Sequence, residues 1–270
     1  MRVVKSVVER SLEVLALLAD DARSLSLGQI AAELGTPKSA THRMLTTLCE
    51  LGWAEQDAQT GFYRLTLRLA VLGQHLLMGT RIPDVCQPVL DKLARETACL
   101  VRMAIVDEEG LTWIAQAQGG RTGLVYQPEV VARVPLHCTA NGKAWLATLP
   151  LATAQQFLRK SRRSDRKVRG RNRAKDDAQF IAELDDARTR GWAITLEEAE
   201  DGVAAIAAPI FMDDSAKAVG TVSVAGAVHH FPSDRIPILA DQAREVANEL
   251  GQLWPLRKPT PASAGRKKDS

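Results

Sequence analysis

The chain has 270 residues, of which 46% are hydrophobic and 25% are charged, with a formal net charge of +3; these values are ordinary for a globular protein with room for two domains and exclude a chain that is disordered throughout. No apolar run approaches the roughly 20 residues that a membrane span needs, and no signal pattern follows Met1, so we expect a cytoplasmic protein with no membrane partner. The four cysteines show no C-x-x-C spacing, which argues against a disulfide framework or a metal cluster, and we predict no metal site and no cofactor.

The first predicted element is an amphipathic helix over residues 4–18. Its apolar positions recur at helical spacing and are Val4, Val7, Val8, Leu12, Leu15 and Leu18. Asp20 to Ser24 indicates a turn out of this helix. We expect the apolar stripe to cover the two helices that follow.

Residues 26–52 carry the pattern of two short helices joined by a tight turn, which is typical of a helix-turn-helix. Ser26 and Gln29 form an S-x-x-Q capping box, and apolar positions then recur at helical spacing until Gly35 ends the first helix. Pro37 is expected at the first position of the second helix, where no N–H is needed.

The second helix of this pair has an apolar face and a polar face. Its polar side chains include short hydrogen-bond donors and cations of the kind that read base edges in a major groove. We predict that DNA is contacted by Lys38, Ser39, Thr41, His42, Arg43 and Thr46, with Thr47 on the same face. Helix pairs of this kind also occur in purely structural bundles, so the prediction depends on the elements that follow.

Two short strands are predicted next, over residues 53–56 and 62–65, joined by a loop from Asp57 to Gly61. A hairpin in this place gives the winged variant of the helix-turn-helix. Arg64, together with polar residues of the loop, is then a candidate for contact with the sugar-phosphate backbone. The alternative is a hairpin that only closes the core.

A further helix is predicted from Thr66 to Gly79, with a strip of leucines along one side. The small winged domain leaves little surface to bury this strip, so pairing with a second copy of the chain is the economical explanation. The alternative is a helix folded back on its own domain. Because Pro83 and Pro88 indicate a boundary, we place the winged helix-turn-helix at residues 1–65 and a linker or dimerisation helix at residues 66–82.

Residues 83–254 alternate between strand and helix patterns, which predicts an α+β domain with antiparallel neighbours. The predicted strands cover residues 99–106, 111–117, 131–136, 192–195, 203–210 and 218–225. The predicted helices cover residues 87–97, 140–149, 151–160, 176–190 and 235–253. Residues 255–270 are rich in Pro, Ser, Gly and Lys, which indicates a disordered basic tail.

Positive charge is concentrated in few places. Ten of the 35 Lys and Arg residues lie between Arg159 and Lys175, so the remainder of residues 83–254 is acidic and should be repelled by a phosphate backbone. The basic run is either an extra DNA or partner surface or a solvated loop. We therefore expect DNA contact to be local to the N-terminal domain.

Three stretches of the C-terminal region resemble the IclR family of bacterial transcriptional regulators. They are Pro135 to Ala144 (PLHCTANGKA), Gly191 to Thr195 with Glu197-Glu198 and Gly202 to Ile210, and the strand Val219 to Gly226. The resemblance covers nearly the whole chain. It implies an N-terminal winged helix-turn-helix, a linker helix, and a C-terminal GAF-like domain that binds a small-molecule metabolite. It also implies a homodimer or homotetramer that acts as a repressor, an activator or both.

The resemblance further implies where the metabolite effector binds. Family pockets for small carboxylates use the start of the helix after the His-Cys-Thr stretch, the strand after the Gly-Trp pair, and the residues flanking a valine in a late strand. In this sequence these positions are Ala140, Asn141, Thr195, Ala205, Ser223 and Ala225. Alanine at 205 and 225 favours a ligand with an apolar body, and the helix start at 140–143 offers N–H groups to an anion.

Two other classes of function compete with this interpretation. An enzyme would draw on His137, Cys138, Glu197, Glu198, His229 and His230. Residues 137 and 138 would point in opposite directions on a strand, however, and no H-E-x-x-H, G-x-S-x-G or P-loop pattern occurs. A zinc site using such histidines is a further alternative. A signalling module whose helix pair contacts only protein is disfavoured by the polar helix and the hairpin.

We therefore predict a ligand-responsive transcriptional regulator, not an enzyme, that acts on double-stranded DNA. We expect a repressor of a catabolic operon that binds a palindromic operator and is released or re-spaced by a small carboxylate metabolite. An activator of the same family is the alternative.

Overall fold

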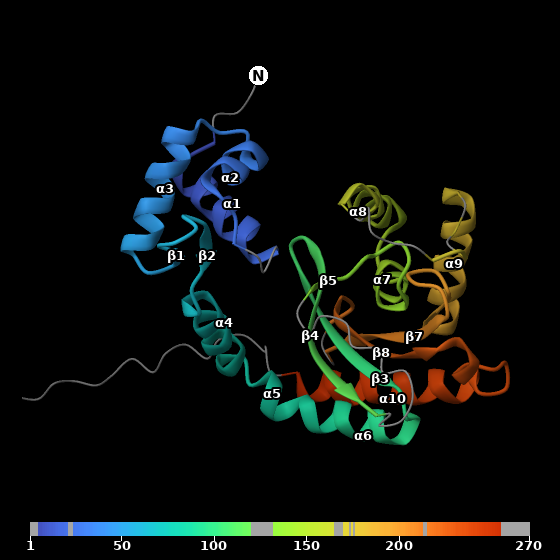
Figure 1. Ribbon diagram of the computed structural model, residues 1–270. Coiled ribbons are helices and arrows are strands. Elements are labelled where there is room, and N and C mark those ends of the chain that lie inside the picture. The colour runs from blue at the N-terminus through green and yellow to red at the C-terminus, as the bar shows by residue number, and fades with distance from the viewer. Residues whose placement is uncertain are drawn as a thin grey trace, which may run out of the picture. The chain divides into compact units, whose positions relative to one another are not determined.

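The computed structural model describes residues 5–20, 24–119, 132–164, 170–172, 174, 176–212 and 215–254. The chain divides into two compact units, residues 1–79 and 80–270, and each unit is described by itself (Figure 1). Much of the basic run between residues 159 and 175, and all of the tail 255–270, lie outside the described residues.

The first unit is a three-helix core followed by a hairpin and a further helix. Its elements are α1 (Val7–Asp20), α2 (Leu27–Leu34), α3 (Lys38–Glu50), β1 (Ala54–Gln56), β2 (Tyr63–Leu65) and α4 (Arg68–Gly79). Val14 of α1, Ile30 of α2 and Leu45 of α3 are fully buried and meet in one apolar cluster. Of the predicted apolar stripe, only Leu15 and Leu18 pack in this cluster. Val7, Val8 and Leu12 are exposed, so the prediction that the whole stripe covers the helix pair was wrong for the first half of α1, and Val4 lies outside the described residues.

The turn between α2 and α3 follows from its capping residues. The side chain of Ser26 accepts the N–H of Gln29, whose own side chain accepts the N–H of Ser26, and this completes the predicted capping box. Gly35 ends α2 with φ of 60°, a conformation that glycine adopts without strain. The placement of Pro37 was wrong by one residue, because its ψ of 140° puts it outside the helix, where its carbonyl accepts the N–H of Thr41.

The hairpin is shorter in its strands than expected. β1 and β2 pair antiparallel from Ala54 with Leu65 to Gln56 with Tyr63, so the loop extends from Asp57 to Phe62. Within the loop the carboxylate of Asp57 accepts the N–H groups of the second and third residues after it, and these bonds lower the pKa of Asp57. The loop is therefore held by its own side chain.

The second unit is built on a six-stranded antiparallel sheet in the order β5-β4-β3-β8-β7-β6. The strands are β3 (Leu100–Asp107), β4 (Gly110–Gln118), β5 (Ala132–Arg133), β6 (Ala193–Leu196), β7 (Val203–Phe211) and β8 (Ala218–Ala227). This arrangement confirms the α+β class. Of the strand expected over residues 131–136, residue 131 lies outside the described residues. The prediction was wrong beyond Arg133, because Pro135 has no N–H for a ladder and the N–H of Leu136 donates to Ser161 Oγ.

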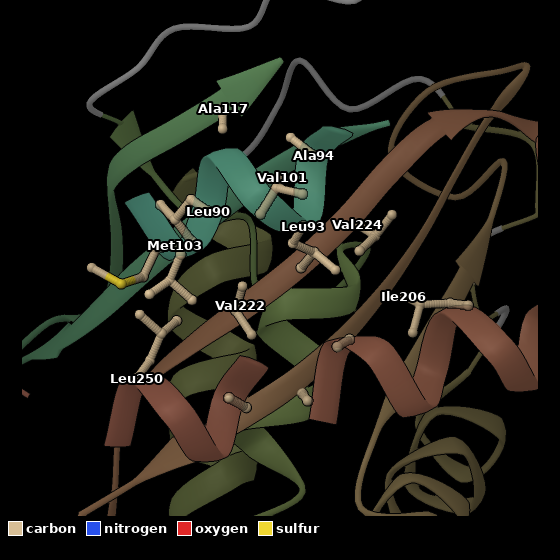
Figure 2. Packing of buried hydrophobic residues seen from close by; sticks show 14 of the residues in the cluster. Leu90, Leu93, Ala94, Val101, Met103, Ala117, Ile206, Val222, Val224 and Leu250 are labelled. Carbon is tan, nitrogen blue, oxygen red and sulfur yellow. The ribbon is translucent and has the colours of Figure 1, made fainter. Parts of the chain in front are cut away.

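Helices cover both faces of this sheet. They are α5 (Ile82–Val85), α6 (Gln87–Thr97), α7 (Ala140–Leu146), α8 (Leu151–Ser164), α9 (Asp177–Arg190), the 3₁₀ helix η1 (Val228–His230) and α10 (Ile236–Leu253). On the face covered by α6 and α10, the side chains of Leu90, Leu93 and Leu250 meet those of Val101 and Val222 from the strands (Figure 2). The opposite face is covered by α7, α8 and α9 and forms a second cluster with Trp145, Leu158 and Phe180.

Two helix ends in this unit differ from the prediction by more than one residue, and the short helix α5 was not predicted. α7 ends at Leu146 rather than 149, because the chain tightens there into the i to i+3 bonds that precede Pro150. α8 continues past 160 to Ser164. The segment around Pro83 and Pro88 is helical as α5 and α6, since each proline occupies a first-turn position that lacks an N–H partner in any case.

None of the helices in the described part of the chain combines the length and the apolar character that crossing a bilayer requires.

Candidate DNA-binding and effector-binding sites

The polar face of α3 is open to solvent. The exposed side chains on it are Lys38, Ser39, His42, Arg43, Thr46 and Thr47. The other face buries Met44, Leu45 and Leu48 against α1 and α2. A helix held by one face in this way presents cationic and hydrogen-bonding side chains to a large partner without disturbing its own core.

Thr41 does not share this face. It is fully buried, its hydroxyl donates to the carbonyl of Pro37 at 3.2 Å, and it lies 2.7 Å from the hydroxyl of Thr36. The prediction that Thr41 contacts DNA was therefore wrong. Its spacing from Met44, Leu45 and Leu48, at i+3, i+4 and i+7, was the available signal that it belongs to the apolar face.

Arg64 of the wing is paired within the hairpin. Its Nε lies 2.6 Å from Oε1 of Glu55, the residue opposite it in the register, and this partner raises the pKa of Arg64. Both side chains remain more than half exposed, at 57% and 51%. Arg64 is thus accessible to a phosphate, although part of its charge is neutralised by Glu55.

The start of α4 is fixed by an arginine that the sequence analysis did not single out. The guanidinium of Arg68 donates to the carbonyl of Leu51 and stacks over Trp53, with 4.9 Å from Cζ to the ring centroid. Thr66 donates to the carbonyl of Gly52 at 2.7 Å. These contacts anchor the first turn of α4 to the end of α3, so the start of α4 is held in place relative to α3.

α4 itself buries none of its residues in the described structure. Its exposed apolar side chains include Val71, Leu72 and Leu76, and Leu76 is 70% exposed. α1 shows a second group, Val7, Val8 and Leu12, each at least 60% exposed. Large apolar surfaces of this kind on one unit are typical of a surface that associates with another chain.

The six predicted effector residues come together on one face of the sheet of the second unit. Thr195, Ala205 and Ala225 pair in register across β6, β7 and β8. Ser223 lies two residues before Ala225 and so points to the same side. This side also packs against α7, where Nδ2 of Asn141 donates to Oγ1 of Thr221 at 2.9 Å and Ala140 is fully buried.

The helix start above this face offers less to an anion than expected. α7 has only seven residues, the side chain of Thr139 accepts the N–H of Gly142, and the carbonyl of Thr139 accepts the N–H of Lys143. The prediction of free N–H groups at positions 142 and 143 was therefore wrong, because the capping threonine uses them.

Lys143 is the centre of a buried charge cluster that the sequence analysis did not predict. It is 2% exposed, and its Nζ lies 2.6 Å from Oε1 of Glu198 and 2.7 Å from Oε2 of Glu183. Burial raises the pKa of Glu198 to about 7, against the opposing effect of Lys143. These three side chains line a hollow of about 310 Å³. Lys143 and Glu198 lie in the stretches that carry the family resemblance and Glu183 does not, and nothing in their sequence spacing showed that the three side chains meet.

The residues that suggested an enzyme or a zinc site are dispersed. His229 and His230 lie in η1 and are exposed, His137 lies 3.3 Å from the hydroxyl of Ser161, and Glu197 pairs with Arg171. Among the residues with described positions, no three His, Cys, Asp or Glu side chains group in a way that could hold a metal ion.

Comparison with known proteins matches nearly the whole chain. A family model described as the IclR helix-turn-helix domain matches residues 7–58, and one described as the bacterial transcriptional regulator IclR C-terminal matches residues 74–252. The glycerol operon regulatory protein of Streptomyces griseus is 32% identical, covering 90% of this chain and 96% of its own. The transcriptional repressor IclR of Escherichia coli is 25% identical, covering 89% and 87%.

A solved structure shares the fold. An IclR homologue from Microbacterium hydrocarbonoxydans, complexed with 4-hydroxybenzoate, has a TM-score of 0.73 at 19% identity and covers 94% of this chain and 100% of its own.

Proposed function

Because this chain belongs to the IclR family of bacterial transcriptional regulators, we propose that it is a ligand-responsive repressor of a catabolic operon. Family membership makes it a DNA-binding regulator and not an enzyme. Repression is supported by the Escherichia coli relative, which is named a transcriptional repressor, and control of an operon by the Streptomyces griseus relative, which is named a glycerol operon regulatory protein.

The observation that carries the proposal is the polar face of α3 in a winged helix-turn-helix. Lys38, His42 and Arg43 are exposed along one side of a helix whose other side is buried. In this geometry the helix enters the major groove, where Arg43 reads a base edge and Lys38 meets phosphate. In the proposed complex, Arg64 of the wing contacts the adjacent sugar-phosphate backbone.

Two such units act together in the proposed complex. The exposed apolar side chains of α1 and α4 form the interface of a homodimer, or of a dimer of dimers, in which each copy buries the strip of the other. We call the winged helix-turn-helix of each copy its head. Two heads related by a two-fold axis require an operator with two inverted half-sites, so the operator is palindromic.

The effector of this regulator is a small carboxylate with an apolar body. Its site is the face where Ala140, Asn141, Thr195, Ala205, Ser223 and Ala225 meet under α7. The homologue complexed with 4-hydroxybenzoate supports a ligand of this class. Because the site and α3 belong to different units, the ligand acts by favouring one spacing of the two heads over another.

A gel-shift with the DNA upstream of this gene and of its neighbouring operon tests the proposal. We expect a discrete complex on one fragment that resists a 100-fold excess of random DNA and protects two inverted half-sites in footprinting. Equal binding to all fragments, with no protected half-sites, would reduce the protein to a non-specific DNA binder and overturn the proposal.

A further inference from the structure

A buried arginine lies on the ligand-facing side of the sheet. Arg102 of β3 is 4% exposed, and its guanidinium carbon lies 3.6 Å from the centroid of the Trp113 ring on β4. Its neighbours Val101 and Met103 point into the apolar cluster under α6 and α10. Because side chains alternate along a strand, Arg102 points to the opposite side, as Ala104 does against α7.

The strand register places this cation beside the proposed effector site. Arg102 is paired with Ser223 of β8 on one side and with Gln116 of β4 on the other. Residues paired in this way have Cβ atoms about 5 Å apart, so Arg102 is a direct neighbour of Ser223 and lies diagonally across from Ala225, two residues further along the strand.

Two polar side-chain atoms near Arg102, one on Trp113 and one on Gln116, are buried without a hydrogen bond. Nε1 of Trp113, a donor, and Oε1 of Gln116, an acceptor, have no partner among the residues that the structure describes. Leaving a buried polar atom unsatisfied is energetically costly, and such atoms are rare in native proteins. A donor and an acceptor of this kind next to a buried cation indicate a site whose hydrogen bonds a ligand completes.

We propose that Arg102, Trp113 and Gln116 form the anchor for the acidic group of the effector, and that the effector is a hydroxy-carboxylate. Arg102 binds the carboxylate, since a planar guanidinium matches its two oxygens. The indole N–H of Trp113 donates to an oxygen of the ligand, and Oε1 of Gln116 accepts from its hydroxyl. The apolar body lies over Ala205 and Ala225. This inference rests on the proposed ligand response and adds the class of ligand and the residues that select it.

The test uses the full-length protein and a panel of glycolate, lactate, 3-hydroxybutyrate and 4-hydroxybenzoate, each beside its parent acid without the hydroxyl and its amide. Binding is followed by calorimetry and by the fluorescence of the tryptophans. We expect saturable binding of at least one hydroxy-carboxylate, with its amide and its parent acid each at least tenfold weaker. No binding by any member of the panel, or equal binding of the acid and its amide, would overturn the proposal.

Variants then assign the binding to these side chains. Arg102→Gln should weaken the preferred acid at least tenfold and abolish its preference over the amide. Trp113→Phe keeps a ring under the arginine but removes the N–H, and it should weaken binding severalfold. Arg190→Gln is the matched control, because Arg190 also stacks on a tryptophan, Trp192, at 4.7 Å but is exposed. Unchanged affinity in both Arg102→Gln and Trp113→Phe would overturn the proposal. If only one of the two variants folds, unchanged affinity in that variant would overturn it.

The same preparations separate this inference from the proposed function. The wild-type protein is assayed on the upstream DNA without ligand and with the preferred acid. A wild-type protein that binds the acid through Arg102 but shows no operator complex would contradict the proposed function and support the anchor. An operator complex in a protein whose ligand binding ignores Arg102 would support the function and contradict the anchor.

Discussion

The two units present the side chains assigned to function in opposite ways. On α3 of the first unit, Arg43 and Lys38 are exposed and make no contribution to the core. In the second unit, Arg102 and Asn141 are almost completely buried between the sheet and its helices. A side chain that meets a large partner has to project from the fold, whereas groups that surround a small ligand have to be enclosed by it. Function and stability should therefore be separable in the first unit and coupled in the second.

The largest loss of stability in the second unit should follow from removal of its buried cation Lys143. At pH 8, Lys143→Met leaves the carboxylates of Glu198 and Glu183 without their partner, and we expect a loss of about 3 to 5 kcal/mol in the free energy of unfolding. Urea denaturation followed by circular dichroism measures it. The double variant Lys143→Met with Glu198→Gln should recover part of the loss. An unfolding curve unchanged by Lys143→Met would show that the cluster is not coupled to stability.

The pH dependence of stability tests the same charge cluster through Glu198. Its pKa is raised from 4.5 to about 7 by burial, so between these values the folded protein binds more protons than the unfolded one, and stability falls as the pH rises. At about 1.4 kcal/mol per pH unit, the contribution of Glu198 should fall by up to about 3 kcal/mol. Comparison with Glu198→Gln at each pH isolates it, and parallel stability profiles for the two proteins would contradict the prediction.

Leu72→Glu tests the exposed apolar surface of the first unit. Leu72 is 55% exposed on α4, so a charge there should leave the fold intact but disrupt pairing with a second copy. We expect the free energy of operator binding to become less favourable by about 1 to 3 kcal/mol, or roughly 5-fold to 150-fold in affinity. The change in operator affinity on addition of ligand should fall by a similar amount. Analytical ultracentrifugation and the gel-shift measure both effects.

Leu151→Glu is the matched control for this change, because Leu151 is an exposed leucine on α8 of the other unit. Full operator affinity and a normal ligand response in Leu72→Glu would show that α4 does not couple the heads.

Arg43→Ala should separate function from stability most clearly. We expect a loss of about 1 to 3 kcal/mol on the operator and less on random DNA, because a base contact is removed. The free energy of unfolding should change by less than about 0.5 kcal/mol, since the side chain is exposed. Arg95→Ala, an exposed arginine on α6, is the control. Equal losses on operator and random DNA would assign Arg43 to phosphate instead.

Thr41 differs from the exposed side chains of α3, because it lies on the same helix but is buried. A change at this position should therefore affect stability and leave DNA binding unchanged. Thr41→Val keeps the shape and removes the hydroxyl that bonds Pro37 and Thr36, so we expect a loss of about 1 kcal/mol in unfolding free energy. Base preference should be unchanged. A selective loss on the operator, without a change in thermal unfolding, would return Thr41 to the interface.

The sequence alone determined most of the first unit. Capping at Ser26 and Gln29, the glycine at 35 and the helical spacing of apolar residues are local signals, and each acts within a few residues of itself. They located the helix pair and the hairpin to within one or two residues. They also predicted the order along the chain of the strands and of the longer helices in the second unit, because strand and helix periods differ, but not the short helices α5 and η1.

Tertiary structure alone decided which of the predicted polar residues are enclosed and which groups meet. Lys143 and Glu198 are 55 residues apart, and Arg102 and Ser223 are 121 residues apart. Such pairs are brought together by the antiparallel order β4-β3-β8-β7-β6 and by the packing of α7 on it. Local periodicity carries no information about these pairings, because the free energy that fixes them comes from burying whole faces of distant segments against one another.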